Sequence, residues 1–170
     1  MKCGAWIITV PEPGSPAFPE RLRVQEDYIG SQLAPLLLDA PPASLLACHS
    51  FHFMRYVDSK NPGHGGITIE LRVLGTAAAI QKAALDIEAI LQNQANSGTI
   101  LKFDSKQVAD WQTADDYGGT RLDEAFTQLL ASSSRLALEL LRNPRRDLAA
   151  RAAVVENWAH CVRLVANGMG

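Results

Sequence analysis

The sequence predicts an α+β fold, in which an antiparallel sheet carries helices on one face and a pair of helices follows at the C-terminal end. Short runs of alternating apolar and polar residues, which are typical of strands, are interspersed along the chain with longer runs whose apolar residues have helical spacing. Two alternating runs are separated only by a turn-rich segment, which is typical of a hairpin. The chain has 170 residues, 47% hydrophobic and 20% charged, which suits one domain with its own core (1–170).

The N-terminal part is expected to be a strand followed by a helix. Residues 4–10 (GAWIITV) are rich in β-branched and aromatic side chains, and a cluster of Pro and Gly follows them. Residues 24–39 have apolar side chains at helical spacing. Pro35 lies inside this run, so we expect a kink or an early end there.

The central part is expected to be an antiparallel hairpin. Residues 51–57 (FHFMRYV) alternate between the two faces of a strand, and so do residues 67–74 (ITIELRVL). The segment between them, residues 58–66 (DSKNPGHGG), has the Pro and Gly residues that turns require.

The C-terminal part is mainly helical. Apolar residues at helical spacing predict three helices, at residues 76–95, 123–142 and 145–167. Between the first two we expect a short strand at 99–103 and an irregular segment at 106–120. The first six elements therefore follow the order βαββαβ of ferredoxin-like folds.

Charge and cysteine content narrow the range of partners and cellular compartments. Sixteen Lys and Arg against eighteen Asp and Glu give a net charge of -2, which argues against a DNA partner or an anionic membrane surface. No apolar run approaches the roughly 18 residues of a membrane helix, and the N-terminal apolar stretch does not resemble a signal peptide. Three cysteines without a CxxC pair fit a reducing cytoplasm.

Four motifs in order resemble the C-terminal domain of lantibiotic dehydratases, also called the thiopeptide-type bacteriocin biosynthesis domain. FHFMRYVDSKNPGHGGITIELRVLG (51–75) is similar to the run FFIRYSDP-HLRLRF-G of that family. DDYGG (115–119) is similar to ERYGG, and FTQLLASSSRLALELL (126–141) to a helix with a DS pair and a terminal LL. AHCVRL (159–164) is similar to HCNRL.

The resemblance implies that the chain matures ribosomally made peptides. The family's domains eliminate glutamate from glutamylated Ser or Thr, and relatives form the thiopeptide ring by a formal [4+2] cycloaddition. Split or shortened members act as partner subunits.

Elimination of a carboxylate needs a base for the α-proton and cations for the developing negative charge. By resemblance, Arg55 and Arg72 hold the leaving group or enolate and His160 moves the proton. Glu70 replaces a family arginine and either orients Arg72 or acts as the base. The matched motifs imply substrate contacts by four further residues: Tyr56, Asp116, Tyr117 and Arg163.

If the chain is an enzyme, we expect Arg55, Arg72 and His160 to converge on one concave pocket. Arg55 and Arg72 lie on neighbouring predicted strands, so they can share a sheet face. Arg72→Ala should then lower turnover about 10²-fold with little loss of stability. The alternative is that an arginine and a glutamate form a cross-strand pair that merely solvates an exposed sheet face, and that His160 is an ordinary helix residue.

Two functions therefore stay open: a small stand-alone lyase or cyclase acting on a leader-bearing peptide, and a non-catalytic subunit that binds the precursor peptide or a dehydratase partner. The charge reversals at Glu70 and Asp116 favour the second; Arg55, Arg72 and His160 favour the first. Histidines and cysteines are not clustered, so we expect no metal and no other cofactor. The chain is expected to associate with itself or with a partner, because it is shorter than the usual family domain.

Overall fold

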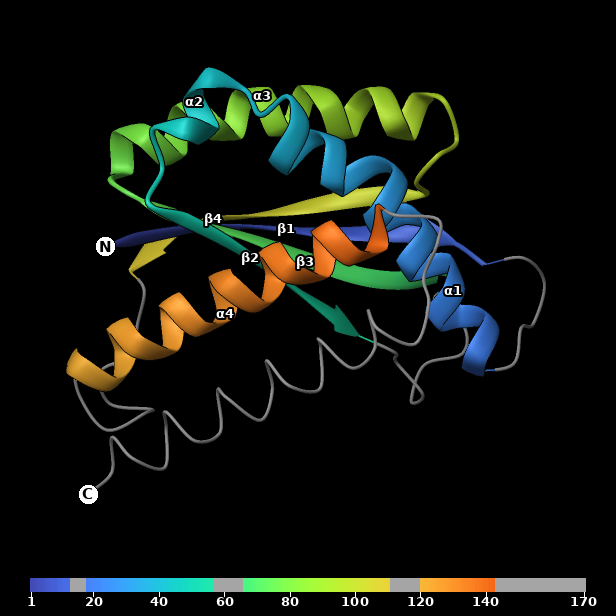
Figure 1. Cartoon of the computed structure of the whole chain (residues 1–170). Coiled ribbons are helices and arrows are strands. Elements are labelled where there is room, and N and C mark those ends of the chain that lie inside the picture. Colours follow the sequence, from blue (N-terminus) through green and yellow to red (C-terminus); the bar gives the residue numbers. More distant parts are fainter. Residues whose placement is uncertain (13–17, 57–65, 111–119, 143–170) are drawn as a thin grey trace.

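Four antiparallel strands form one sheet in the computed structural model, which describes residues 1–12, 18–56, 66–110 and 120–142 (Figure 1). The strands are β1 (Lys2–Pro11), β2 (Ser50–Tyr56), β3 (Gly66–Gly75) and β4 (Lys102–Asp110). Their order across the sheet is β2-β3-β1-β4, so β1 and β3 are central. Two interleaved βαβ units produce this order, and the predicted α+β class is confirmed.

The predicted hairpin is also confirmed. β2 pairs antiparallel with β3, and their register matches Phe53 with Leu71 and Arg55 with Ile69. The turn expected between the two strands falls largely at residues 57–65, outside the described residues.

The first helical segment continues through its proline. α1 (Phe18–Tyr28) is followed by two π-helical segments, η1 (Ile29–Leu33) and η2 (Pro35–Asp39). The N–H of Ala34 donates to the carbonyl of Ile29, five residues back, and the N–H of Ala40 donates to that of Pro35. Wider turns therefore accommodate a residue that has no N–H to donate. The short helix α2 (Ala43–Leu46) follows.

One face of the sheet packs against helices and forms the core. Trp6 and Ile8 of β1 and Leu71 of β3 are at most 2% exposed on this face. α3 (Ala77–Asn96) covers it with Ile80 and Ile87, which are fully buried. Figure 1 shows α3 running along one side of the sheet. The helix starts where the Thr76 side chain accepts a hydrogen bond from the Ala79 N–H, which is an N-cap.

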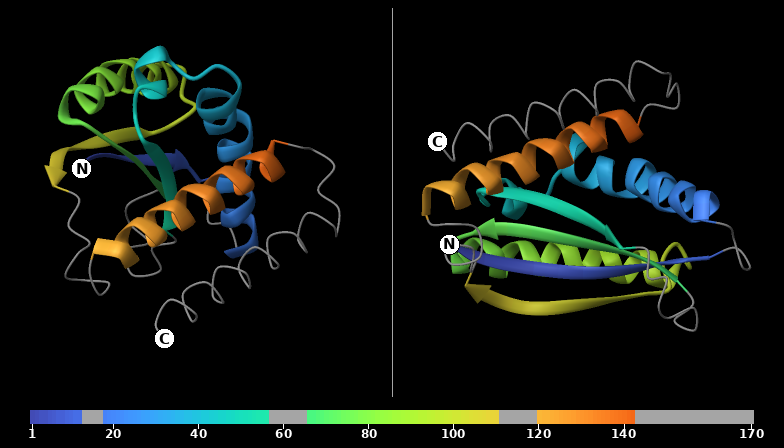
Figure 2. Two further views of the ribbon diagram at one scale, coloured as in Figure 1. Left: turned by 60° about the vertical axis from the view of Figure 1, so that its left-hand side comes forward. Right: turned by 90° about the horizontal axis from the view of Figure 1, so that it is seen from below.

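α4 (Thr120–Leu141) lies along the edge strand β2, as Figure 2 shows from below. An edge strand presents every second backbone N–H away from the sheet. The hydroxyl of Ser134 accepts such a bond from the Phe53 N–H at 3.1 Å, and Leu138 is fully buried in the core. α4 therefore covers the edge of β2 with a specific backbone contact.

The fourth strand corrects the sequence-based expectation. β4 begins at Lys102, where we expected the strand to begin at residue 99, and continues to Asp110 through residues expected to be irregular. Residues 101–106 are mostly exposed because β4 is the outer strand, so its sequence lacks the apolar alternation that marks a buried strand. The helix expected at 145–167 lies outside the described residues.

Candidate functional site

Polar side chains gather on the sheet face opposite α3. Glu70 and Arg72 are two residues apart on β3 and therefore share this face. The Arg72 Nε donates to the Glu70 Oε1 at 3.0 Å, and the Lys106 Nζ of β4 lies 3.9 Å from the same oxygen. Glu70 is only 4% exposed. We call His52, Glu70, Arg72 and Lys106 the polar cluster.

His52 joins the cluster because β2 pairs it directly with Arg72. Its side chain is fully buried. Burial, followed by the positive charge of Arg72, lowers the pKa of His52 to about 4, against a smaller opposing effect of the Glu70 carboxylate. The imidazole is therefore neutral at physiological pH.

Cys3 of β1 is near enough to feel the same charges. Burial raises the pKa of its thiol, while Arg72 lowers that pKa and Glu70 raises it. The thiol is therefore protonated at neutral pH, and it is not set up as a nucleophile.

Arg55 lies on the other face of the sheet, so the expected convergence of Arg55 with Arg72 is wrong. Arg55 pairs with Ile69, which is three residues from Arg72 and thus faces the opposite way. The Arg55 Nη1 lies 3.6 Å from the Glu26 Oε1 of α1, in a partly exposed ion pair.

The remaining predicted site residues are placed only in part. Tyr56 is the last residue of β2 and pairs with Thr68. Four of them lie outside the described residues, and their roles stay predictions: Asp116, Tyr117, His160 and Arg163.

Sequence reasoning missed His52 and Lys106 as members of the cluster. The register of the hairpin places His52 opposite Arg72, and the match between the apolar faces of β2 and β3 is the signal that could have found it. Lys106 fell in a segment expected to be irregular, and only its pairing with Ala5 of β1 brings it beside β3.

Two kinds of feature are absent from the described part of the chain. It contains no group of three or more His, Cys, Asp or Glu arranged to hold a metal ion. None of its helices is long and apolar enough to cross a membrane.

The comparisons with known proteins identify the family. Residues 21–167 match the model described as "Lantibiotic biosynthesis dehydratase C-term", so the chain belongs to this family. Membership supports a role in the biosynthesis of ribosomally made and modified peptides. Comparison with curated protein sequences finds no match.

Two solved structures are similar to the chain. The tRNA-dependent lantibiotic dehydratase MibB from Microbispora sp. 107891 is 21% identical with a TM-score of 0.61, over 86% of this chain and 12% of MibB. TsrL is 22% identical with a TM-score of 0.43, over 89% of this chain and 38% of TsrL. The likeness to MibB shows a shared fold, and the chain spans about one eighth of the length of MibB.

The charge balance of the cluster limits its chemistry. The carboxylate of Glu70 contacts Arg72, the one arginine that the described strands place on this sheet face, so the pair is neutral as a unit. The family motif quoted above has a second arginine in place of Glu70. Lys106 adds a cation, but its side chain is 60% exposed and water screens it. The arrangement therefore offers an anionic group much less attraction than two uncompensated arginines would.

Proposed function

We propose that the chain binds a ribosomally made precursor peptide as a partner subunit in its maturation and does not itself expel glutamate from that peptide. The observation that carries this proposal is the ion pair between Arg72 and the buried Glu70. An arginine whose positive charge is compensated by a contacting carboxylate attracts a second carboxylate less strongly than an uncompensated one.

The position of Arg55 supports the same proposal. Its guanidinium lies on the opposite sheet face and faces Glu26. In the described part of the chain, both arginines that the resemblance assigned to the leaving group thus have carboxylate neighbours of their own. Stabilisation of an expelled carboxylate needs cations aimed at the place where charge develops.

The sharpest test replaces Glu70 by its neutral isostere. In the wild type, the neutral pair should make the affinity for a glutamylated precursor peptide equal to that for the unmodified peptide. Glu70→Gln should free the guanidinium of Arg72 and create a preference for the glutamylated peptide of about 10-fold, the usual worth of a charge-assisted hydrogen bond. Fluorescence anisotropy with the two labelled peptides measures both affinities.

A matched control and a contrary result complete this test. Glu26→Gln removes the carboxylate beside Arg55 on the other face and should leave the two affinities equal. A wild-type preference of 10-fold or more for the glutamylated peptide that is lost in Arg72→Gln would contradict the proposal, because it would show that Arg72 already holds an anion.

A second candidate function is catalytic, and the burial of the polar cluster favours it. A neutral imidazole, a carboxylate and an arginine within one buried patch are typical of sites that move protons. In such an enzyme Glu70 takes the α-proton, the Cα–H electron pair forms the double bond, and the Cβ–O bond breaks to release the carboxylate beside Arg72. His160 would carry the proton onward.

The catalytic candidate makes its own prediction for the same variant. Loss of the base in Glu70→Gln should reduce elimination by about 10²-fold or more, since general base catalysis contributes on that scale. Mass spectrometry of the peptide follows this loss directly. The binding-subunit proposal predicts no elimination to lose.

A further inference from the structure

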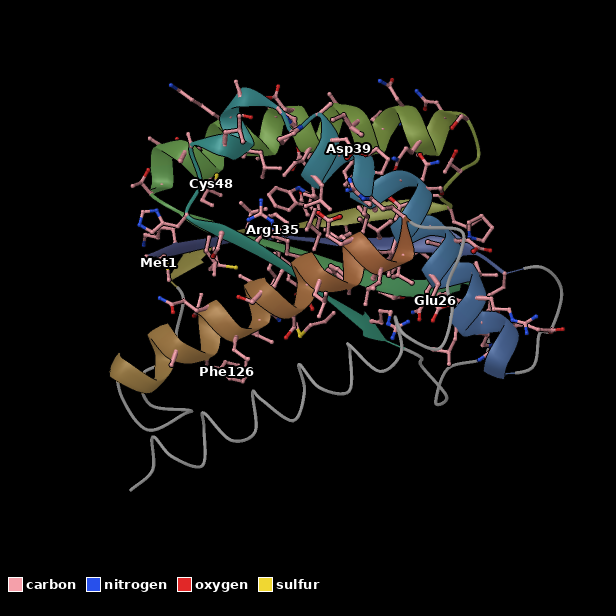
Figure 3. The ribbon with its side chains drawn as sticks, viewed as in Figure 1. Met1, Glu26, Asp39, Cys48, Phe126 and Arg135 are labelled. Atoms are coloured by element: carbon pink, nitrogen blue, oxygen red, sulfur yellow. The ribbon has the colours of Figure 1, made fainter. Side chains whose placement is uncertain are left out.

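A pocket lies on the helix-covered side of the sheet, away from the polar cluster. It has a volume of about 290 Å³ and opens between α2, the beginning of β2 and the middle of α4. Cys48 and Arg135, which both line it, are labelled in Figure 3. No member of the polar cluster lines this pocket, so the pocket is separate from the cluster.

The pocket has one apolar side and one polar side. Leu37, Leu45 and Leu46 form the apolar side. Leu46 is 71% exposed, which is unusual for a leucine at a concave surface and leaves apolar area for a ligand to cover. His49, Ser132 and Arg135 contribute to the polar side.

Arg135 is a cation with no carboxylate partner among the described residues. The carboxylate nearest along the helix, Glu139, lies one turn further on and holds the Arg142 Nη2 at 2.7 Å. Asp39 is held by Arg142 as well. Of the described residues that line the pocket, none is acidic, so the positive charge of Arg135 is not compensated inside it.

We propose that this pocket binds a carboxylate attached to an apolar group, of about the size of one or two amino-acid residues. The carboxylate would pair with the Arg135 guanidinium and accept a hydrogen bond from Ser132, while the apolar group would cover the leucines. A volume of 290 Å³ is at the small end of ligand sites. This inference does not depend on the proposed function.

The carboxylate has two sources, a free C-terminal carboxylate or an acidic side chain, and titrations monitored by backbone amide NMR distinguish them. N-acetyl-leucine carries the first, an acetylated leucyl-aspartyl amide carries the second, and N-acetyl-leucinamide carries neither. We expect at least one of the two acids to shift the amides of Phe51 and Ser132 saturably. The uncharged amide should bind about 10-fold or more weakly.

Variants of Arg135 test the role of the charge. Arg135→Gln should weaken binding of the acid about 10-fold or more, whereas Arg23→Gln, at an exposed position of α1, should leave it unchanged. The amide spectrum of each variant shows whether it is folded. Equal affinities of wild type and Arg135→Gln, equal binding of acid and amide, or no shifts with either acid up to millimolar concentrations would overturn the proposal.

Substitution of Arg142 provides an independent check, because Arg142 forms an ion pair with Glu139, the carboxylate that could otherwise pair with Arg135. Arg142→Gln should release Glu139, which is four residues from Arg135 and can then pair with it on the same helix face. Binding of the acid should weaken, and addition of Glu139→Gln should restore it. Failure of the double variant to restore binding would count against a direct contact of the ligand with Arg135.

Discussion

At the scale of single residues, His52 makes the buried polar cluster sensitive to pH. Its pKa of about 4 in the folded chain lies below the ordinary value of 6.5. The unfolded chain therefore binds more protons than the folded chain between these two values, and the free energy of unfolding must fall as the pH falls through this window. Below pH 4 this residue contributes no further loss.

The pH dependence of stability can be assigned to His52 by substitution. Wild type should lose on the order of 3 kcal/mol more stability between pH 6.5 and 4 than His52→Gln, since each pKa unit corresponds to about 1.4 kcal/mol. Urea unfolding at several pH values measures this difference. His49→Gln, at an exposed position, is the matched control and should keep the wild-type slope; identical slopes in wild type and His52→Gln would show that burial does not hold the imidazole neutral.

Because Glu70 is buried, the Arg72→Ala substitution affects the stability of the fold as well as the site. The sequence suggested that this substitution costs little stability, but Glu70 is 4% exposed and Arg72 is its closest cationic partner among the described residues. Removing the guanidinium leaves a buried carboxylate poorly compensated, which destabilises the fold as well as altering the site. Glu70→Gln is therefore the cleaner probe of the cluster.

At the scale of elements, the packing of α4 against β2 is stabilised by a hydrogen bond to the hydroxyl of Ser134. Ser134→Ala should lower the free energy of unfolding by about 1–2 kcal/mol, because the Phe53 N–H loses its acceptor in a partly buried place. Ser132→Ala, two residues earlier and exposed, should change it by less than about 0.5 kcal/mol. Urea unfolding compares the two; equal effects would mean that the hydroxyl of Ser134 does not hold the helix.

The strands and helices with a strong apolar pattern could be predicted, and those without one could not. β2 and β3 alternate because one face is buried, and α3 ends where Gly98 adopts a φ of 76°, a conformation that glycine tolerates. β4 is an outer strand with mostly exposed side chains at residues 101–106. It therefore lacks apolar alternation, and its bounds could not be predicted from the sequence.

The sequence-based prediction of the candidate site holds only within a single strand. A period of two places Glu70 and Arg72 on one face without further information. Whether Arg55 or His52 joins them depends on the register of β2 against β3, and a shift of one residue would exchange the two. The alternation of β2 places Arg55 on the face of Phe51 and Phe53, and matching that apolar face to the apolar face of β3 brings His52 to Arg72. Arg55 was expected in the site because the two strands were not matched by their apolar faces.

At the scale of the whole molecule, the fold presents two different surfaces on the two sides of one sheet. The polar cluster with its neutral Glu70–Arg72 pair lies on one side, and the pocket with the uncompensated Arg135 lies on the helix-covered side. Membership in the lantibiotic dehydratase C-terminal family assigns the fold to peptide maturation. On the charge balance around Glu70, we propose that the chain binds the peptide and does not expel glutamate from it. Association with itself or with a partner stays a prediction, to be measured by light scattering.

The central claim, that the chain does not itself expel glutamate from the precursor peptide, is tested most directly by the mass of a glutamylated precursor peptide after incubation with the purified chain alone. We predict that the peptide keeps its glutamyl group, with wild type and with Glu70→Gln alike. The contrary result is that the wild type removes the glutamyl group and forms a dehydroamino acid, whereas Glu70→Gln does not. That result would contradict the claim and establish the chain as the eliminating enzyme.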